Sequence, residues 1–388
     1  MIKRILRLIL VYGAFLTIIS FATVQFFLIL RHKSPYLSDS YFYKHIFYQM
    51  KGNSPEIARR KIVSQVDLAN ADEITKNIFT NEKAYQNSYQ FFIKRPFYPF
   101  IVWLLSFLTS KEYLLFLVPI FSAYAGSIIL SFRLFTYNLE YFFAIFALAL
   151  FVSFYPFLDW STYFLTDTIG FFFWLGQVVV IYRYTSSENN RLLLFYGLLL
   201  LLSLFNREQS LLMVPLTLFL LMLMKFFGAP RKQLVASFRL VIVSLIIAFF
   251  FLLFTKIFGF VGIWETIVYT QNSYGLYSNQ YTLVQTLQYL FETIKKSHLV
   301  FAREIVSHHW WFTFTALGIL GIAKMTLLSK EKKLIDLIIL CSGIASYLSI
   351  FIYPVLSYRF FLPTVIMIAY FAAKFIQNFF EERQSLKL

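Results

Sequence analysis

Three acidic residues stand where an apolar run meets a polar one, a position from which a carboxylate can do chemistry at a membrane surface. Asp39 comes nine residues after the first apolar run ends at Leu30, and Asp159 and Asp167 flank the start of a later run. Such a carboxylate suits general base catalysis, because it can take the proton of an attacking hydroxyl group. The structural alternative for Asp39 is that it caps the helix of aromatic residues that follows it.

Asp159 and Asp167 leave the same two explanations open. Asp167 comes three residues into the apolar run that begins at Phe164, where an unpaired carboxylate would be costly. The N-terminus of a helix would lower that cost and would account for the residue without a catalytic role. We therefore keep both carboxylates as candidates for the base, after Asp39.

Two arginines also lie between apolar runs, Arg207 beside Glu208 and Arg359 beside Tyr358. A guanidinium group binds phosphate oxygens in pairs, so both arginines suit a lipid phosphate at the level of the headgroups. The alternative for Arg207 is that Glu208 only neutralises it in a tight turn. A purely structural role is equally open for Arg359.

The sequence lacks the common patterns for metal or cofactor binding. Its single Cys, Cys341, lies inside an apolar run, which excludes a disulfide and a Cys-based metal site. No phosphate-binding glycine loop, nucleophile elbow, zinc-ligand spacing or Asp-x-Asp pair is present. We therefore expect no cofactor, and the chemistry does not demand a divalent metal.

The composition shows what kind of scaffold must position these groups. The chain of 388 residues is 59% hydrophobic and only 14% charged, whereas soluble proteins carry about 25% charged residues. It therefore belongs to the membrane class. The net charge of +16 does not indicate a nucleic-acid partner, because the basic residues lie between apolar runs and form no basic stripe.

Ten apolar runs have about the length that a helix needs to span a bilayer, which is roughly 20 residues. They predict one all-α integral membrane domain over residues 1–388. The first run is too long for the core of a signal peptide and is interpreted as a retained anchor. The predicted spans are 5–30, 113–132, 141–158, 164–182, 192–205, 211–227, 240–260, 310–328, 334–353 and 360–380.

The distribution of basic residues predicts the orientation. With a cytoplasmic N-terminus and a non-spanning segment 97–109, the inner segments carry 17 Lys and Arg, and the short outer loops carry two, Arg207 and Arg359. This asymmetry follows the positive-inside rule, and it breaks if 97–109 crosses the membrane. We therefore expect a multi-pass protein of the plasma (inner) membrane with both termini in the cytoplasm.

This topology places the candidate residues on the outer face. Residues 31–112 form a long first outer loop, in which 97–109 is predicted to be an interfacial helix. Residues 262–309 form a second large outer loop. Within it, 281–296 has helical periodicity and is predicted to lie on the membrane surface.

The order of these features resembles the GT-C superfamily, the polytopic glycosyltransferases that use polyprenyl-phosphate-linked sugars. The nearest group in pattern is that of the protein O-mannosyltransferases and aminoarabinose transferases. The resemblance covers most of the chain, from the early Asp39 of the first outer loop to the start of the last span. Its most specific parts are Arg95-Pro96-Phe97-Tyr98-Pro99 and Tyr358-Arg359-Phe360-Phe361-Leu362-Pro363.

The resemblance implies an inverting glycosyltransferase with a polyprenyl-phosphate sugar as donor and a glycan or glycolipid of the cell envelope as acceptor. It makes Asp39 the base, with Asp167 and Asp159 as alternatives. It assigns Arg207, Arg359 and the adjoining Glu208 to the lipid phosphate site. Donor or acceptor contacts would come from Arg95, Tyr98 and Tyr358.

Two departures and two rival classes limit what the resemblance implies. The chain lacks the Asp-Glu pair of the O-mannosyltransferases and a sizeable C-terminal soluble domain, so a protein acceptor is not expected. A transporter or flippase of lipid-linked glycans would also use intramembrane Arg and Asp, but the sequence has no repeat symmetry. A membrane acyltransferase would need a catalytic His, and the five His form no such site.

Overall fold

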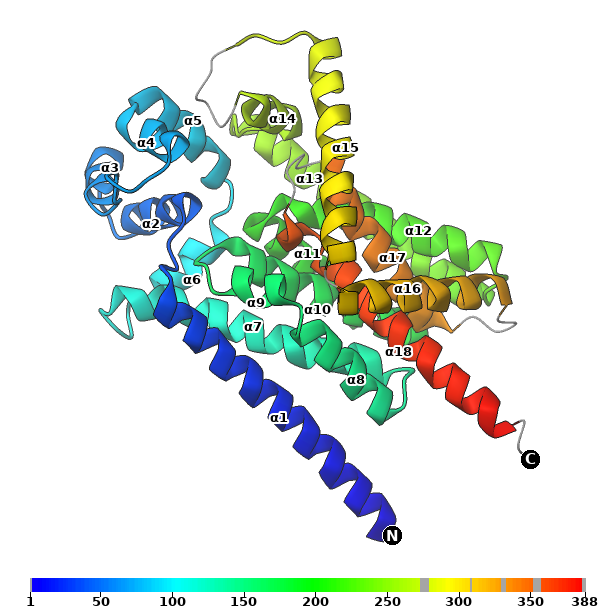
Figure 1. Cartoon of the computed structure of the whole chain (residues 1–388). Coiled ribbons are helices and arrows are strands. Elements are labelled where there is room, and N and C mark those ends of the chain that lie inside the picture. The colour runs from blue at the N-terminus through cyan, green and yellow to red at the C-terminus, as the bar shows by residue number, and fades with distance from the viewer. Residues whose placement is uncertain (1, 273–278, 308, 329–332, 352–356, 386–388) are drawn as a thin grey trace.

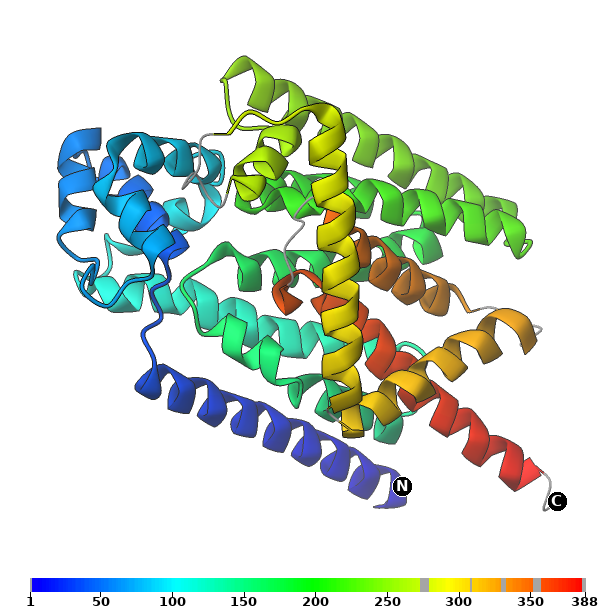
Figure 2. The same cartoon turned by 45° about the horizontal axis from the view of Figure 1, so that its top comes forward.

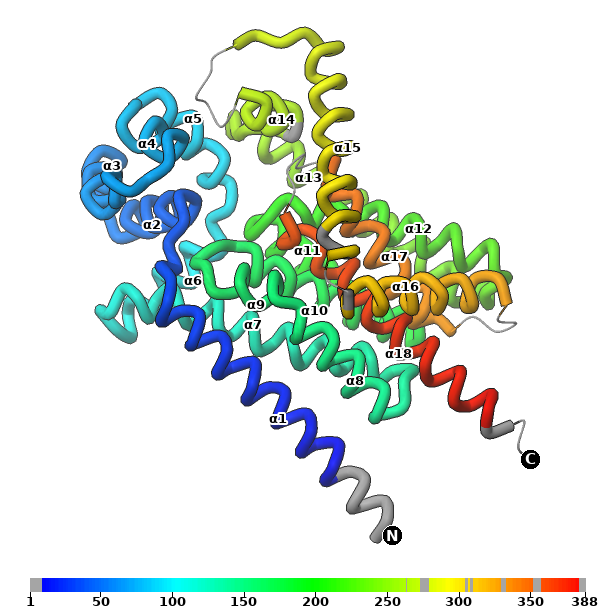
Figure 3. Tube along the Cα trace, viewed as in Figure 1, coloured from blue at the N-terminus to red at the C-terminus, as the bar shows by residue number. Residues whose placement is uncertain are grey.

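Every regular element in the described part of the chain is a helix (Figures 1 and 3). The computed structural model describes residues 2–272, 279–307, 309–328, 333–351 and 357–385. The first half of the chain forms α1 (Ile2–His32), α2 (Ser38–Met50), α3 (Pro55–Val63), α4 (Glu73–Thr80), α5 (Glu82–Phe92), α6 (Phe97–Leu105), α7 (Glu112–Thr136), α8 (Tyr141–Val152), α9 (Tyr155–Ser161) and α10 (Thr166–Ser187).

The second half continues the same pattern, with short 3-10 and π segments between the helices. It forms α11 (Asn190–Asn206), η1 (Glu208–Leu212), α12 (Met213–Phe226), α13 (Arg231–Ile257), α14 (Ile263–Gln271), α15 (Leu283–Ser307), α16 (His309–Ala323), η2 (Lys324–Leu328), α17 (Leu334–Tyr347), η3 (Leu348–Phe351), η4 (Tyr358–Phe360) and α18 (Leu362–Ser385).

Among the described residues, seven helical segments are long and apolar enough to cross a membrane, and the bent pair α8–α9 would make an eighth. The prediction of an all-α, multi-pass membrane protein is thus confirmed. The seven segments are Ile9–His32, Glu112–Thr136, Glu208–Phe226, Arg231–Ile257, Trp310–Leu328, Leu334–Phe351 and Leu362–Arg383.

Three of the ten predicted spans fall short of these criteria, each for its own reason. The run 141–158 is divided into α8 and α9, which are bent by 62°. Pro156 lies in the first turn of the second helix, because it has no N–H to continue the helical hydrogen bonds of α8. Helix α11 has only 17 residues. The ninth run, 334–353, passes the criteria, although its last two residues lie outside the described part.

Helix α10 falls short because it lies inside the protein. Of its 22 residues, 15 are buried, and it packs against α7, α11, α13 and α17. A helix surrounded by protein needs no continuous apolar surface, and polar groups on it can pair with its neighbours. Gln177 does so, by donating a hydrogen bond to Ser203 Oγ at 2.7 Å.

The predicted first outer loop forms a small helical unit made of α2–α6, which we call the outer unit after that prediction. Side-chain caps explain where its helices begin, since Ser54, Asp72 and Asn81 each accept a backbone N–H at the start of α3, α4 and α5. An aromatic core holds the helices together. Phe42 of α2 stacks on Phe92 of α5 with ring centroids 4.8 Å apart.

Helix α6 covers the first part of the segment predicted to be interfacial. It has nine residues and ends at Leu105, so it is roughly 14 Å long. That is under half of the roughly 30 Å hydrocarbon core, and α6 therefore cannot cross a membrane alone. The other predicted surface helix, 281–296, overlaps α15, which begins at Leu283 and continues to Ser307.

The outer unit sits at one end of the long helices. Figures 1 and 2 show α2–α5 together at this end, with α14 beside them. Helix α15 runs at a large angle to α1. A backbone hydrogen bond joins Phe164 N to Pro35 O at 2.9 Å, so the start of the outer unit is tied to the segment between α9 and α10. The end of the unit is tied to η1 by ion pairs described below.

Candidate functional site

A cavity of about 360 Å³ lies between the outer helices α2, α4, α5 and α14 and the ends of the long helices. We call it the central cavity. Five segments that are far apart in the sequence meet there, and four of them contribute residues that the sequence predicted. The predicted residues that line it are Asp39, Arg95, Asp167, Arg207 and Arg359.

Asp39 lies in the first turn of α2 but does not cap it. The helix begins at Ser38, its N-cap residue is Leu37, and no side chain makes the N-cap hydrogen bond. Instead Ser40 Oγ accepts the backbone N–H of Leu37 at 3.1 Å. The Asp39 carboxylate is half-buried in the cavity wall, and the nearest cation is Arg359 Nη1 at 3.9 Å. The capping explanation therefore does not account for Asp39.

Asp167 lies in the first turn of α10 and is almost completely buried. It forms an ion pair with Arg207, and its Oδ1 is 3.5 Å from Arg359 Nε. The helix N-terminus favours its negative charge, and the two guanidinium groups offset the cost of burying it. Asp167 therefore holds both arginines at one edge of the cavity.

Arg207 is positioned by the break between α11 and η1. It is the C-cap residue of α11 and has an extended backbone, with φ −164° and ψ 132°. This break directs Arg207 and Glu208 to different partners. Glu208 pairs with Lys94 at 2.5 Å and with Arg95 Nη2 at 2.8 Å, whereas Arg207 pairs with Asp167. The alternative in which Glu208 neutralises Arg207 is therefore not what the structure shows.

Arg359 connects the two candidate carboxylates. It lies in η4, and its guanidinium stacks over the Trp160 ring with its carbon 4.7 Å from the ring centroid. Phe360 lies beneath both arginines, 5.0 Å from Arg359 and 4.7 Å from Arg207. Such stacking orients a guanidinium without using its N–H donors, so the donors can point at an anion.

Arg95 lines the cavity and joins the outer unit to the bundle. Its Nε donates to Glu208 Oε2 at 2.8 Å, so it contacts that carboxylate through two nitrogens. Its Nη1 is 3.5 Å from the Tyr43 hydroxyl. Burial raises the pKa of Tyr43, although the Arg95 charge opposes the shift. The hydroxyl therefore stays protonated at neutral pH and can donate a hydrogen bond.

Four other predicted residues do not line the central cavity. Glu208 lies behind Arg95, as described. Asp159 pairs with Lys33 at 2.6 Å, and both side chains are partly exposed. Tyr98 is fully buried and donates to the Phe116 carbonyl at 2.9 Å. Tyr358 packs its ring against Phe154 and Phe301.

The sequence argument missed several lining residues, above all Trp160 and Tyr269. In a chain with 21% aromatic residues, aromatic type alone does not single out a site. Trp160 adjoins Asp159, which was a candidate, but the argument did not extend to its neighbour. Tyr269 comes from α14 in the predicted second outer loop, and the one charged residue of that helix, Glu265, was not a candidate.

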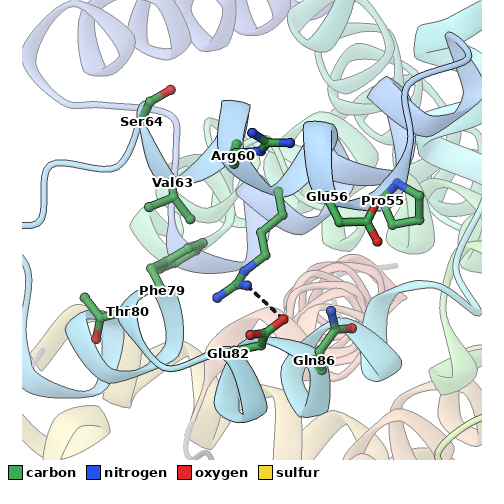
Figure 4. Close-up of a pocket in the computed structure, with 10 residues that line it drawn as sticks. Pro55, Glu56, Arg60, Val63, Ser64, Phe79, Thr80, Glu82 and Gln86 are labelled. Atoms are coloured by element: carbon green, nitrogen blue, oxygen red, sulfur yellow. Dashed lines mark ion pairs between the residues drawn. The ribbon is translucent and has the colours of Figure 1, made fainter.

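The largest cavity described is a different one, and we call it the charged groove. It has a volume of about 790 Å³ and lies on the outer unit, between α3 and the helices α4 and α5 (Figure 4). Its charged groups neutralise one another in solvent, for example Arg59 and Glu82 at 3.3 Å. It contains none of the predicted residues, and we do not regard it as the reaction site.

No cluster of three or more His, Cys, Asp or Glu side chains that could hold a metal ion occurs in the part of the chain that the structure describes. The cations of the central cavity are arginines. Chemistry that develops negative charge there would therefore meet guanidinium groups.

The fold and the cavity define a helical, multi-pass membrane protein with a polar site between its outer helices and its bundle. No protein-family model matches the sequence, and no curated protein is significantly similar to it.

Proposed function

We propose that the chain is an inverting glycosyltransferase that moves a sugar from a polyprenyl-phosphate donor to a glycan or glycolipid acceptor at the outer face of the plasma membrane. The observation that carries the proposal is the arrangement of the central cavity. There Asp39 lines the same cavity as Arg207 and Arg359, and its Oδ2 is 3.9 Å from Arg359 Nη1, so a carboxylate that can accept a proton lies near cations that can receive a phosphate.

In the proposed reaction Asp39 takes the proton of an acceptor hydroxyl as the oxygen attacks the anomeric carbon of the donor sugar. The bond between that carbon and the phosphate oxygen breaks, and polyprenyl phosphate leaves with the bonding electrons. Arg207 and Arg359 stabilise the charge that develops on the phosphate. The configuration at the anomeric carbon inverts, because the hydroxyl attacks from the face opposite the leaving group.

The geometry supports Asp39 as the base more than Asp167. Asp167 is almost fully buried and contacts both arginines, so its role in the proposal is to hold them in place. Asp39 is half-buried, and its separation of 3.9 Å from Arg359 exceeds the roughly 2.8 Å of a charge-assisted hydrogen bond. A donor phosphate can therefore replace Asp39 on Arg359 and leave the carboxylate for the acceptor.

The proposal includes the ten-span topology with both termini in the cytoplasm. Two groupings support it. The segments predicted to be outside meet at the central cavity, whereas Asn138, Asp336 and Lys374, which lie at predicted inner ends, meet each other. Reporter fusions at Arg133, Arg191 and the C-terminus should all report cytoplasm. An external C-terminus would contradict the topology.

One assay tests the proposal against the flippase alternative. The purified protein in detergent, supplied with a polyprenyl-phosphate sugar and a glycan acceptor, should release polyprenyl phosphate and form a glycosidic bond. Flipping needs a sealed vesicle, whereas transfer does not. Activity only in sealed proteoliposomes, with the sugar still attached to its lipid, would favour the flippase and contradict the proposal.

A further inference from the structure

A second hollow adjoins the central cavity, and we call it the amide groove. It has a volume of about 640 Å³ and lies between α5 and α14, which stand next to each other in Figures 1 and 2. Six of its fourteen lining residues are amides, namely Asn77, Asn81, Asn87, Gln90, Asn272 and Asn279. No residue of the groove was a candidate in the sequence.

The lining has the chemistry that recognises a neutral sugar. An amide side chain both donates and accepts hydrogen bonds, as hydroxyl groups do. Trp264 adds an aromatic face and is 43% exposed, so a sugar ring can lie against it. Asn272 Oδ1 is buried and accepts no hydrogen bond from the described residues, and a sugar hydroxyl would satisfy it.

The charges of the groove argue against an anionic ligand. Only Lys83 and Glu265 are charged among its lining residues, and no arginine is available for bidentate contact with a phosphate. The charged groove of Figure 4 differs in this respect. Four of its ten lining residues are charged, namely Glu56, Arg59, Arg60 and Glu82.

The amide groove adjoins the reaction site, and the two cavities share a wall. Phe91 and Tyr269 line both cavities, and their rings are 4.3 Å apart. A hydrogen bond between Tyr269 and Ser88 fixes this wall to α5. A chain of several sugars could therefore lie in the groove while its terminal hydroxyl reaches past Tyr269 toward Asp39.

We propose that the amide groove binds the non-reacting sugars of a neutral oligosaccharide acceptor, with Trp264 as the stacking platform. This inference rests on the proposed function and specifies its acceptor. The two amides Gln90 and Gln86 provide a matched pair for testing it. Both are exposed on α5 one turn apart, but Gln90 lines the amide groove and Gln86 lines the charged groove.

The first experiment measures binding without any donor. Saturation-transfer NMR on the full-length protein in detergent would use cellotriose, maltotriose and chitotriose as probes. We expect at least one to bind, Trp264→Ala to weaken that binding roughly tenfold, and Gln90→Ala to weaken it less. Gln86→Ala should leave it unchanged. No binding by any probe, or equal binding by wild type and Trp264→Ala, overturns the inference.

The second experiment separates this inference from the proposed function. With a saturating donor, Trp264→Ala should raise the KM for the acceptor roughly tenfold and leave kcat and the donor KM within about twofold. Transfer by all variants with an unchanged acceptor KM overturns the groove but retains the glycosyltransferase. Binding of trisaccharides without any transfer retains the groove and contradicts the glycosyltransferase. An acceptor KM that responds to Trp264→Ala only with an unglycosylated peptide identifies a peptide groove and overturns the inference.

Discussion

Two buried carboxylates, Asp167 and Asp336, lie at opposite ends of the helical bundle and differ in what surrounds them. Each is paired with a basic residue of another element, Arg207 and Lys374 respectively. Each side chain is almost completely buried, at 5% and 1% exposure. Burial and pairing alone therefore do not distinguish them.

The ion-pair and hydrogen-bond partners of Asp336 come from the helical bundle itself. Its carboxylate pairs with Lys374 and accepts hydrogen bonds from Tyr370 at 2.5 Å and from Asn138 at 2.9 Å. It lines none of the three cavities considered above. Such a cluster fixes how α17, α18 and the end of α7 pack.

The Asp167 cluster opens onto the central cavity. It contains two arginines, and Arg359 extends beyond Asp167 to the half-buried Asp39. The second carboxylate belongs to α2, so the cluster brings together charged groups of the helical bundle and of the outer unit. A buried ion pair becomes a candidate site when a cavity adjoins it and a further ionisable group faces it from another unit.

The largest expected effect comes from Asp39→Asn. Asparagine keeps the shape of the side chain but cannot take a proton, so transfer should fall by roughly 10²–10⁴. Because Asp39 makes no cap hydrogen bond and its ion pair is long and partly exposed, the melting temperature should stay close to wild type. The measurement is the transfer rate in detergent beside a thermal unfolding curve.

Asp167→Asn provides the control for that experiment. Removing the buried charge leaves Arg207 without its main partner, so this variant should lose stability as well as activity. If Asp39→Asn transfers sugar normally and Asp167→Asn, still folded, does not, the base is Asp167. If both variants transfer normally, the mechanism is wrong.

The next largest effect should come from Lys374→Met at the other cluster. The substitution leaves Asp336 buried without its cation and should lower the free energy of unfolding by roughly 3–5 kcal/mol. A second substitution, Asp336→Leu, should restore much of the loss, because it removes the uncompensated charge. Folded protein should retain the wild-type kcat, since the cluster touches no site. A thermally stable Lys374→Met protein with a strongly reduced kcat would contradict the distinction drawn between the Asp336 and Asp167 clusters.

The arginines should show a smaller effect, and it should be confined to the donor. Arg207→Lys and Arg359→Lys keep the charge but lose the planar pair of donors. Each should reduce kcat/KM for the donor by roughly ten- to hundredfold, the effect of one or two charged hydrogen bonds. Steady-state kinetics with varied donor tests this. Full activity in both Arg→Ala variants would exclude the phosphate role.

The sequence argument named five of the six charged residues that line the central cavity, and it missed Asp72. Asp167, Arg207 and Arg359 stand near the ends of apolar runs, where a charge is costly unless it has a partner or a function. It did not predict their partners. Arg207 and Glu208 are adjacent in sequence, yet they pair with α10 and with the outer unit, because the break after α11 turns them to different sides.

The fold, like the site, was predicted from the sequence only in part. Hydropathy located the seven described helical segments that are long and apolar enough to cross a membrane, since lipid requires backbone hydrogen bonds to be satisfied within the helix. It was less reliable for α10, whose environment is protein, and for the bent pair α8–α9, where Pro156 interrupts a continuous apolar run. The amide groove was not predicted, because neutral amides carry no distinctive pattern in a single sequence.

The smallest effect is expected at a third carboxylate, Asp159, which adds a partly exposed ion pair to the comparison. Asp159 pairs with Lys33, but the side chains are 24% and 21% exposed, and Asp159 does not line the central cavity. A partly exposed pair of this kind contributes roughly 0–1 kcal/mol. Asp159→Asn should therefore change the melting temperature only slightly and leave transfer within about twofold of wild type, because a group that reaches neither substrate nor the arginines cannot supply the chemistry.

Asp159 also tests whether lining the central cavity is the right criterion for choosing the catalytic carboxylate. It is adjacent to Trp160, which stacks on Arg359, so a small change in the position of that ring could reach the site through the backbone. Asp159→Ala, which removes the carboxylate and leaves Lys33 only its hydrogen bond to the backbone carbonyl of residue 159, tests for such an indirect effect. Normal transfer in both variants would agree with the cavity-based assignment. A loss of 10²-fold or more in Asp159→Asn, in protein that unfolds at the wild-type temperature, would make Asp159 the base in place of Asp39. The carboxylate would then act from outside the cavity seen here, and the contrast drawn between Asp167 and Asp336 would no longer identify the reaction site.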